Sequence, residues 1–133
     1  MVQGSVLGPC LFTMFIDDID LCVELIRCII LKFADDTKVG KCITSLDDAQ
    51  AFQRIIDNLW DWSNKWGMSF NVEKCKIMHI GIKNPQMPYF MDGKLLEAIS
   101  EEKDLGILIT DNLKPVHQCA AAAKKANQVI GQI

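Results

Sequence analysis

The apolar and polar positions of the chain change period several times, from helical spacing to alternation and back. The first segment, residues 6–21, carries apolar residues on nearly every side, which predicts a helix buried over most of its surface. Residues 45–66 form the clearest helical pattern, with one apolar face, acidic residues after Ser45 and Gly67 at the end. A last helix is expected over residues 113–130.

Strand patterns fill most of the remaining chain. Residues 26–43 contain an apolar β-branched run, two aspartates and an alternating run, which predicts a hairpin with the acidic pair at or near its tip. Residues 75–81 and 104–110 are expected to form strands, and Asp92-Gly93 between apolar runs predicts a second hairpin. Strands and helices are mixed and paired mainly through hairpins, which predicts an α+β fold.

The composition narrows the class of protein. Half of the 133 residues are apolar and 23% are charged, which is typical of a folded domain rather than a disordered chain. The net charge is −3 and no block of Lys and Arg stands out, which argues against autonomous nucleic-acid binding but not against a part in a larger nucleic-acid enzyme. The apolar run at residues 6–16 is too short to span a bilayer and lacks the features of a secretion signal, so no membrane partner is expected.

The six cysteines form no CxxC pair and match no zinc-site spacing. They lie among apolar residues, as buried reduced thiols do. This favours a reducing, intracellular compartment over a disulfide scaffold, without distinguishing nucleus from cytoplasm.

Two interpretations of Asp35 and Asp36 stand side by side. Aspartate is a favoured turn residue, and an acidic pair at a hairpin tip is ordinary. However, an apolar strand and Phe33-Ala34 lead directly into the pair, which favours a metal site, because Mg²⁺ takes carboxylate oxygens together with substrate phosphates. Neighbours on a strand point to opposite faces, so the two are not expected to be equal ligands, and a two-metal site would need a carboxylate from another element.

Four segments of the chain together resemble the reverse transcriptases of non-LTR (LINE-type) retrotransposons. They are QGSVLGP (3–9), FADD (33–36), WSNKWGMSFNVEKCKIMHIG (62–81) and KDLGILITDNLKPVHQ (103–118). All four occur in the family's order, and the resemblance covers essentially the whole chain. It implies a partial polymerase palm over residues 1–112, with the catalytic β-hairpin inside it, and the start of a thumb over residues 113–133.

The resemblance also implies a catalytic role for the acidic pair. Asp35 would be the metal ligand, for Mg²⁺, and Asp36 would be its neighbour with a secondary role. The family chemistry is RNA-templated DNA synthesis by two-metal nucleotidyl transfer, with an RNA template, a DNA primer and deoxynucleotides as partners of the complete enzyme.

Further residues acquire binding roles from the same resemblance. Gln3 and Gly4 would lie at the templating base pair and the incoming nucleotide. Lys74 would approach the triphosphate, with Lys76 as the alternative. Leu105-Gly106 would fall in the hairpin that grips the primer.

The chain departs from the family in two respects. Val2 stands where a proline normally precedes the glutamine. The fingers and the first palm motif, which supplies the other catalytic aspartate, would precede Met1. The chain alone is therefore expected to be inactive. The alternative function is a non-catalytic retroelement remnant that acts as a protein-interaction module, with an exposed apolar face that self-associates.

Overall fold

The computed structural model describes residues 7–22 and 28–131. Helix α1 (Leu7–Ile16) continues into the 3-10 helix η1 (Asp17–Cys22). The later elements, in chain order, are β1 (Ile29–Phe33), β2 (Asp36–Gly40), α2 (Leu46–Lys65), η2 (Val72–Lys74), β3 (Lys76–Met78), β4 (Phe90–Met91), β5 (Lys94–Leu95), β6 (Glu97–Ile99), β7 (Glu101–Asp104), β8 (Ile107–Thr110) and α3 (Val116–Ile130).

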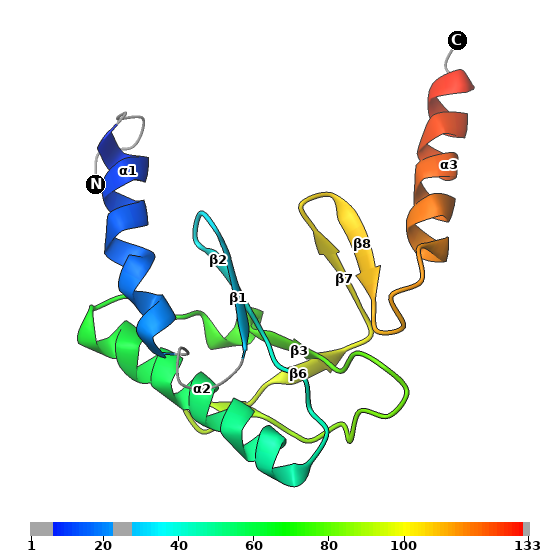
Figure 1. Cartoon of the computed structure of the whole chain (residues 1–133). Helices are drawn as coiled ribbons and strands as arrows, with labels where there is room; N and C mark the ends of the chain where they lie inside the picture. Colours follow the sequence, from blue (N-terminus) through cyan, green and yellow to red (C-terminus); the bar gives the residue numbers. More distant parts are fainter. Residues whose placement is uncertain (1–6, 23–27, 132–133) are drawn as a thin grey trace.

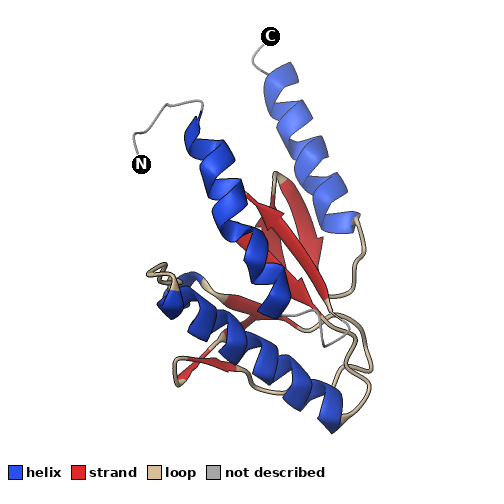
Figure 2. Cartoon of the chain, turned by 60° about the vertical axis from the view of Figure 1, so that its left-hand side comes forward, coloured by secondary structure: helices blue, strands red, loops and turns tan. Residues whose placement is uncertain are grey.

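Helix α2 forms the base of the molecule, and the other long elements rise from one side of it (Figure 1). The β1–β2 and β7–β8 hairpins stand between α1 and α3, and both hairpin turns point away from α2 (Figure 1). The same order of helix, strands and helix is visible after rotation (Figure 2). The predicted α+β class is confirmed.

The strands form four separate two-stranded sheets in the described part of the chain. Pairs β1–β2, β4–β5 and β7–β8 are antiparallel hairpins, whereas β3 and β6 pair in parallel. Both predicted hairpins are therefore confirmed. The strand predicted over residues 104–110 begins only at Ile107, because Leu105-Gly106 form the turn of the β7–β8 hairpin, where the family resemblance places them.

The core lies on two sides of α2, as its helical stripe predicts. One cluster joins Ile55 and Leu59 of α2 to Ile19 of η1, and the inner face of the β1–β2 hairpin packs against it through Ile30 and Val39. The second cluster packs other α2 residues against the β4–β5 region; its members are Ala49, Ile56, Tyr89, Met91 and Leu96. The first cluster fixes the β1–β2 hairpin to the base helix, because burial of its apolar face is the main stabilising term.

The start of α2 is held by a capping box. The Ser45 Oγ accepts a hydrogen bond from the Asp48 backbone N–H at 3.2 Å, and the Asp48 carboxylate accepts one from the Ser45 N–H at 3.2 Å. The same carboxylate accepts hydrogen bonds from the Thr44 hydroxyl and backbone N–H at 2.7 and 3.0 Å. These bonds from Thr44 first, then Ser45 and the Lys41 charge, hold the pKa of Asp48 well below its usual range.

Helix α1 contradicts the prediction of a helix buried on most sides. Within it only Ile16 is buried, while Leu7, Leu11 and Met14 are 69%, 54% and 71% exposed. The helix also ends at Ile16 rather than near residue 21. The segment that follows, η1, contains three aspartates and is a 3-10 helix. Phe15 packs on Trp62 of α2 and on Trp66 at the C-cap of that helix, with ring centroids 6.5 and 5.4 Å apart, whereas the side of α1 that carries the three exposed residues is uncovered.

Two further predictions need correction. Helix α3 begins at Val116 rather than near residue 113, because Pro115 occupies the N-cap position. Cysteines 10, 42 and 119 are exposed rather than buried, whereas Cys28 and Cys75 are half-buried, and burial raises the pKa of both thiols. No helix in the described ranges is both long and apolar enough to cross a bilayer.

Candidate active site

The two aspartates lie at the tip of the β1–β2 hairpin. Phe33 pairs with Asp36, so Ala34 and Asp35 form a two-residue turn. Ala34 has a φ of 52°, in the left-handed region that such tight turns require at their first central position. Both carboxylates are exposed. Because Asp35 lies in the turn and Asp36 begins β2, their environments differ, and the predicted tip position is confirmed.

Lys32 fixes the hairpin to the segment that follows α1. Its ammonium lies 3.0 Å from the Asp20 carboxylate and 3.5 Å from the backbone carbonyl of Ile16. In the same segment, Asp18 accepts a hydrogen bond from the Trp62 indole N–H at 3.0 Å. The acidic residues after α1 therefore anchor the strand that precedes Asp35 and the base helix, a structural role that explains them without a metal.

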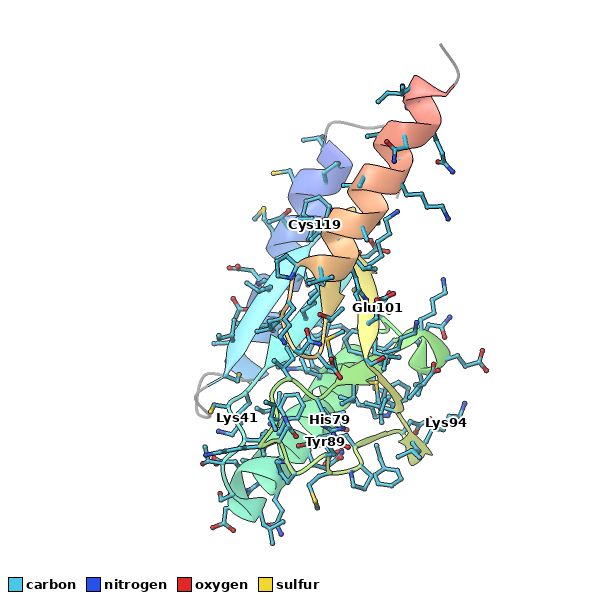
Figure 3. The ribbon with its side chains drawn as sticks, turned by 90° about the vertical axis from the view of Figure 1, so that its right-hand side faces the viewer. Lys41, His79, Tyr89, Lys94, Glu101 and Cys119 are labelled. Carbon is cyan, nitrogen blue, oxygen red and sulfur yellow. The ribbon has the colours of Figure 1, made fainter. Side chains whose placement is uncertain are left out.

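An open groove of about 1560 Å³ runs between β2, the chain after η2 and the β7–β8 hairpin. Its wall contains seven lysines and only four acidic side chains, although the whole chain has a net charge of −3. The lysines are Lys38, Lys41, Lys74, Lys76, Lys83, Lys103 and Lys114. His79 also lines it and stacks on Tyr89 with ring centroids 6.1 Å apart, and both are labelled in Figure 3. The groove therefore concentrates positive charge beside the hairpin that carries the aspartates.

The two candidate triphosphate ligands differ in their partners. Lys76 lies 3.2 Å from the Glu102 carboxylate and is neutralised by it. Lys74, at the end of η2, is exposed and has no acidic partner among the described residues. Asn71 holds this short helix by accepting a hydrogen bond from the Glu73 backbone N–H at 3.2 Å. An unpaired ammonium is the better anion ligand, which favours Lys74 over Lys76.

Leu105 and Gly106 form the turn between β7 and β8. Both have positive φ values, 46° and 86°, as a type I′ turn requires. The first turn of α3 is fixed to this hairpin, because Gln118 accepts a hydrogen bond from the Leu108 backbone N–H at 2.8 Å. The β7–β8 turn and the β1–β2 turn lie at the same end of the molecule (Figure 1). The structure thus places the predicted primer-contacting turn on the same side as Asp35.

Comparisons with known proteins decide the family. The family described as "Reverse transcriptase (RNA-dependent DNA polymerase)" matches residues 1–129. The chain belongs to the reverse transcriptase family. It is 29% identical over 118 residues to the "RNA-directed DNA polymerase from mobile element jockey" of Drosophila melanogaster. The protein of the same name from Drosophila funebris is 32% identical over 120 residues.

Each comparison with a jockey polymerase covers 84% of this chain but 13% of the relative, so the chain corresponds to a small part of those proteins. The resemblance to LINE-type reverse transcriptases is thereby confirmed. No solved structure matches the chain.

The structure brings only some of the predicted site residues together. Asp35, Lys74 and Leu105-Gly106 lie in described elements, whereas Gln3 and Gly4 lie outside the described residues. Within residues 7–22 and 28–131, no three His, Cys, Asp or Glu side chains are close enough to share a metal ion. The donors present are the two exposed carboxylates at the hairpin tip, which fit part of a Mg²⁺ site completed by phosphate oxygens.

Lysines in the groove were missed as functional candidates by sequence reasoning. Lys38, Lys83, Lys103 and Lys114 come from separate strands and loops, so no basic run marks them in the sequence. The sequence gives only a weak indication of a basic groove, since residues 73–133 are only slightly more basic than acidic. The fold, rather than the linear sequence, produces the positive surface.

Proposed function

We propose that the chain is the part of a reverse transcriptase domain that carries one side of the metal site for RNA-templated DNA synthesis. In this reaction the primer 3′-hydroxyl attacks the α-phosphate of a deoxynucleotide and pyrophosphate leaves. Family membership supports the reaction class. The observation that carries the assignment is the exposed acidic turn at Asp35, on a hairpin that borders a lysine-rich groove.

Each proposed site residue has a role that follows from its chemistry. Asp35 would hold Mg²⁺, which when bound would supply positive charge that stabilises the attacking and leaving oxygens, and Asp36 would have a secondary role. Lys74 binds the triphosphate through its unpaired ammonium. Leu105-Gly106 contacts the primer strand. Gln3-Gly4 contacts the templating base pair, where a residue without Cβ permits close backbone approach.

The proposed boundary between palm and thumb lies at residue 113. Helix α3 contains no buried residue and touches the rest of the described chain mainly through β8. Such a helix stabilises little of the palm and suits the start of a separate unit. It also carries Lys124 and Lys125 on an exposed surface.

The chain alone is proposed to lack polymerase activity. A two-metal site needs a carboxylate from a second element, and the described residues bring none into a cluster with Asp35. The test is a primer-extension assay with purified chain, RNA template, DNA primer, deoxynucleotides and Mg²⁺. No incorporation is expected. Incorporation that Asp35→Asn abolishes would show that the site is complete and contradict the proposal.

A second candidate function is self-association through the uncovered apolar side of the chain. Besides the exposed α1 residues, Ile29, Leu31 and Phe33 of β1 are 66%, 61% and 60% exposed on one strand face. The outer edge of β1 has no paired strand among the described elements. An apolar face beside a free strand edge favours pairing with a second copy.

Sedimentation over a range of protein concentrations tests this second function. We expect concentration-dependent dimers, and we expect Leu31→Lys to shift them to monomer. Leu95→Lys is the matched control, since Leu95 is 63% exposed on a different hairpin. A monomer at all concentrations, or equal effects of the two substitutions, would contradict the role of the β1 face.

A further inference from the structure

The β1–β2 and β7–β8 hairpins carry the proposed catalytic and primer-contacting turns, yet they share no strand pairing. Their turns lie at the same end of the molecule (Figure 1). A reaction between a metal-bound nucleotide and a primer end requires reacting atoms about 3–3.5 Å apart. Because no backbone hydrogen bonds pair the two hairpins, side-chain contacts have to fix the distance between their turns.

Strand β7 is connected to three different elements by its three carboxylates. Glu101 lies 2.5 Å from the His117 ring of α3, and Glu102 lies 3.2 Å from the ammonium of Lys76 in β3. Asp104 forms an ion pair with Lys38 of β2. Residues 102 and 104 share one face of the strand and 101 lies on the other, as the alternation of a strand requires.

Among the ion pairs of the described residues, the pair between Lys38 and Asp104 joins the two hairpins. Asp104 is the last residue of β7, directly before Leu105, and its side chain is 23% exposed. Lys38 lies in β2, two residues beyond Asp36, on the same strand face. The pair therefore connects the hairpins within a few residues of both turns.

We propose that Lys38 and Asp104 are positioning residues that fix the primer-contacting turn relative to the Asp35 turn. This inference rests on the proposed function of the two turns. Neither residue touches the reacting groups; each acts by holding the other's hairpin. A partly exposed ion pair contributes little to global stability. The predicted effect therefore lies in the geometry of the groove and in the binding of a primer–template duplex.

A different role for Lys38 makes the opposite prediction. If Lys38 only attracted phosphates, then Asp104 would merely weaken that attraction. Asp104→Lys would then add positive charge to the groove and strengthen duplex binding. If the pair positions the hairpins, Asp104→Lys places two like charges together, separates the hairpins and weakens binding despite the added charge.

The test measures binding of a fluorescent RNA–DNA primer–template duplex to this chain by anisotropy at fixed salt. We expect Lys38→Asp and Asp104→Lys each to weaken binding about fivefold, and the charge-swapped double variant to restore it to within about twofold. Glu73→Lys is the matched control, because it makes the same charge change on the wall of the groove and leaves both the Lys38–Asp104 and the Lys76–Glu102 pairs intact. It should not weaken binding. Tighter binding by Asp104→Lys, or a swap no better than either single variant, would overturn the inference.

A second measurement separates this inference from the proposed function. The proposed function is judged by primer extension within a complete polymerase, and if the unsubstituted chain does not bind the duplex by itself, the pair is judged by amide hydrogen exchange. We expect faster exchange in peptides from both hairpins in each single variant and recovery in the swapped variant. Unchanged exchange in all three variants would refute the positioning role.

Discussion

At the residue level, the three hairpin turns differ in whether the residue in the left-handed region is of a type that favours that conformation. The β4–β5 turn uses Asp92-Gly93, with φ values of 53° and 70°, which is a favoured pair for a type I′ turn. The two turns of the proposed site place Ala34 and Leu105 in the left-handed region instead. A side chain there costs about 1–2 kcal/mol unless it is Gly, Asn or Asp. Strain at these positions fits a functional constraint.

Replacement of Leu105 by Asn should therefore stabilise the chain. Asn tolerates the left-handed region, and Leu105 is 62% exposed, so little packing is lost. We expect a gain of about 1 kcal/mol, seen as a rise of about 4 °C in the thermal melting temperature. Leu95→Asn is the control, since Leu95 is equally exposed in a strand of ordinary φ. An equal gain from both substitutions would argue against strain at Leu105.

Asp48 gives the clearest prediction for pH. The hydrogen bonds from Thr44 and Ser45 lower its pKa, so the unfolded chain binds this proton more readily than the folded chain does. The stabilisation is present above the ordinary aspartate pKa of about 4 and is lost as the pH falls below it. Melting temperatures measured from pH 6 to pH 3 should fall less steeply for Asp48→Asn than for the unsubstituted chain.

Asp47 provides the comparison for this experiment. It lies in the same first turn of α2 but accepts none of the capping hydrogen bonds. Asp47→Asn should leave the acid slope of the melting temperature nearly unchanged. A slope for Asp48→Asn as steep as that of the unsubstituted chain would show that the capping carboxylate contributes nothing to acid sensitivity.

At the scale of elements, most helices and hairpins follow from the sequence. The capping sequence after Ser45, the one-sided apolar stripe and Gly67 place α2, and Asp92-Gly93 places the β4–β5 turn, because these signals are local. The hydrophobic pattern alone misses the β7–β8 turn, because Leu105 is not a turn residue by composition, whereas the family resemblance places Leu105-Gly106 in a hairpin. The parallel β3–β6 pair is missed because its partners are distant in the sequence.

One tertiary contact between elements has no local signal. The Gln53 amide of α2 accepts a hydrogen bond from the Phe90 N–H at 2.9 Å and donates one to the Phe90 carbonyl at 2.7 Å. Gln53→Glu removes the donor and sets a carboxylate against that carbonyl. We expect a loss of about 1–3 kcal/mol in the free energy of unfolding, measured by urea titration. Gln50→Glu, at an exposed position of the same helix, should lower the free energy of unfolding far less. Equal losses would show that the Gln53–Phe90 hydrogen bonds do not stabilise the fold.

At the scale of the whole molecule, the hairpin tip of the site could be predicted and the groove could not. Asp35 is marked by the apolar strand that precedes it and by the order of motifs around it. The lysines of the groove are dispersed between residues 38 and 114, and only the fold brings them together. The burial predicted for the first helix was wrong, because an apolar pattern reports the preference of a segment for burial, not the presence of a partner that covers it.

Primer extension by a chimeric enzyme tests whether this chain serves as part of a larger polymerase. Residues 1–129 of this chain would replace the matching segment of the Drosophila melanogaster jockey polymerase. We predict Mg²⁺-dependent DNA synthesis on an RNA template that Asp35→Asn reduces about a thousandfold, while Asp36→Asn retains part of the activity. Synthesis by the Asp35→Asn chimera at the rate of the unsubstituted chimera would show that Asp35 is not a ligand of the catalytic metal.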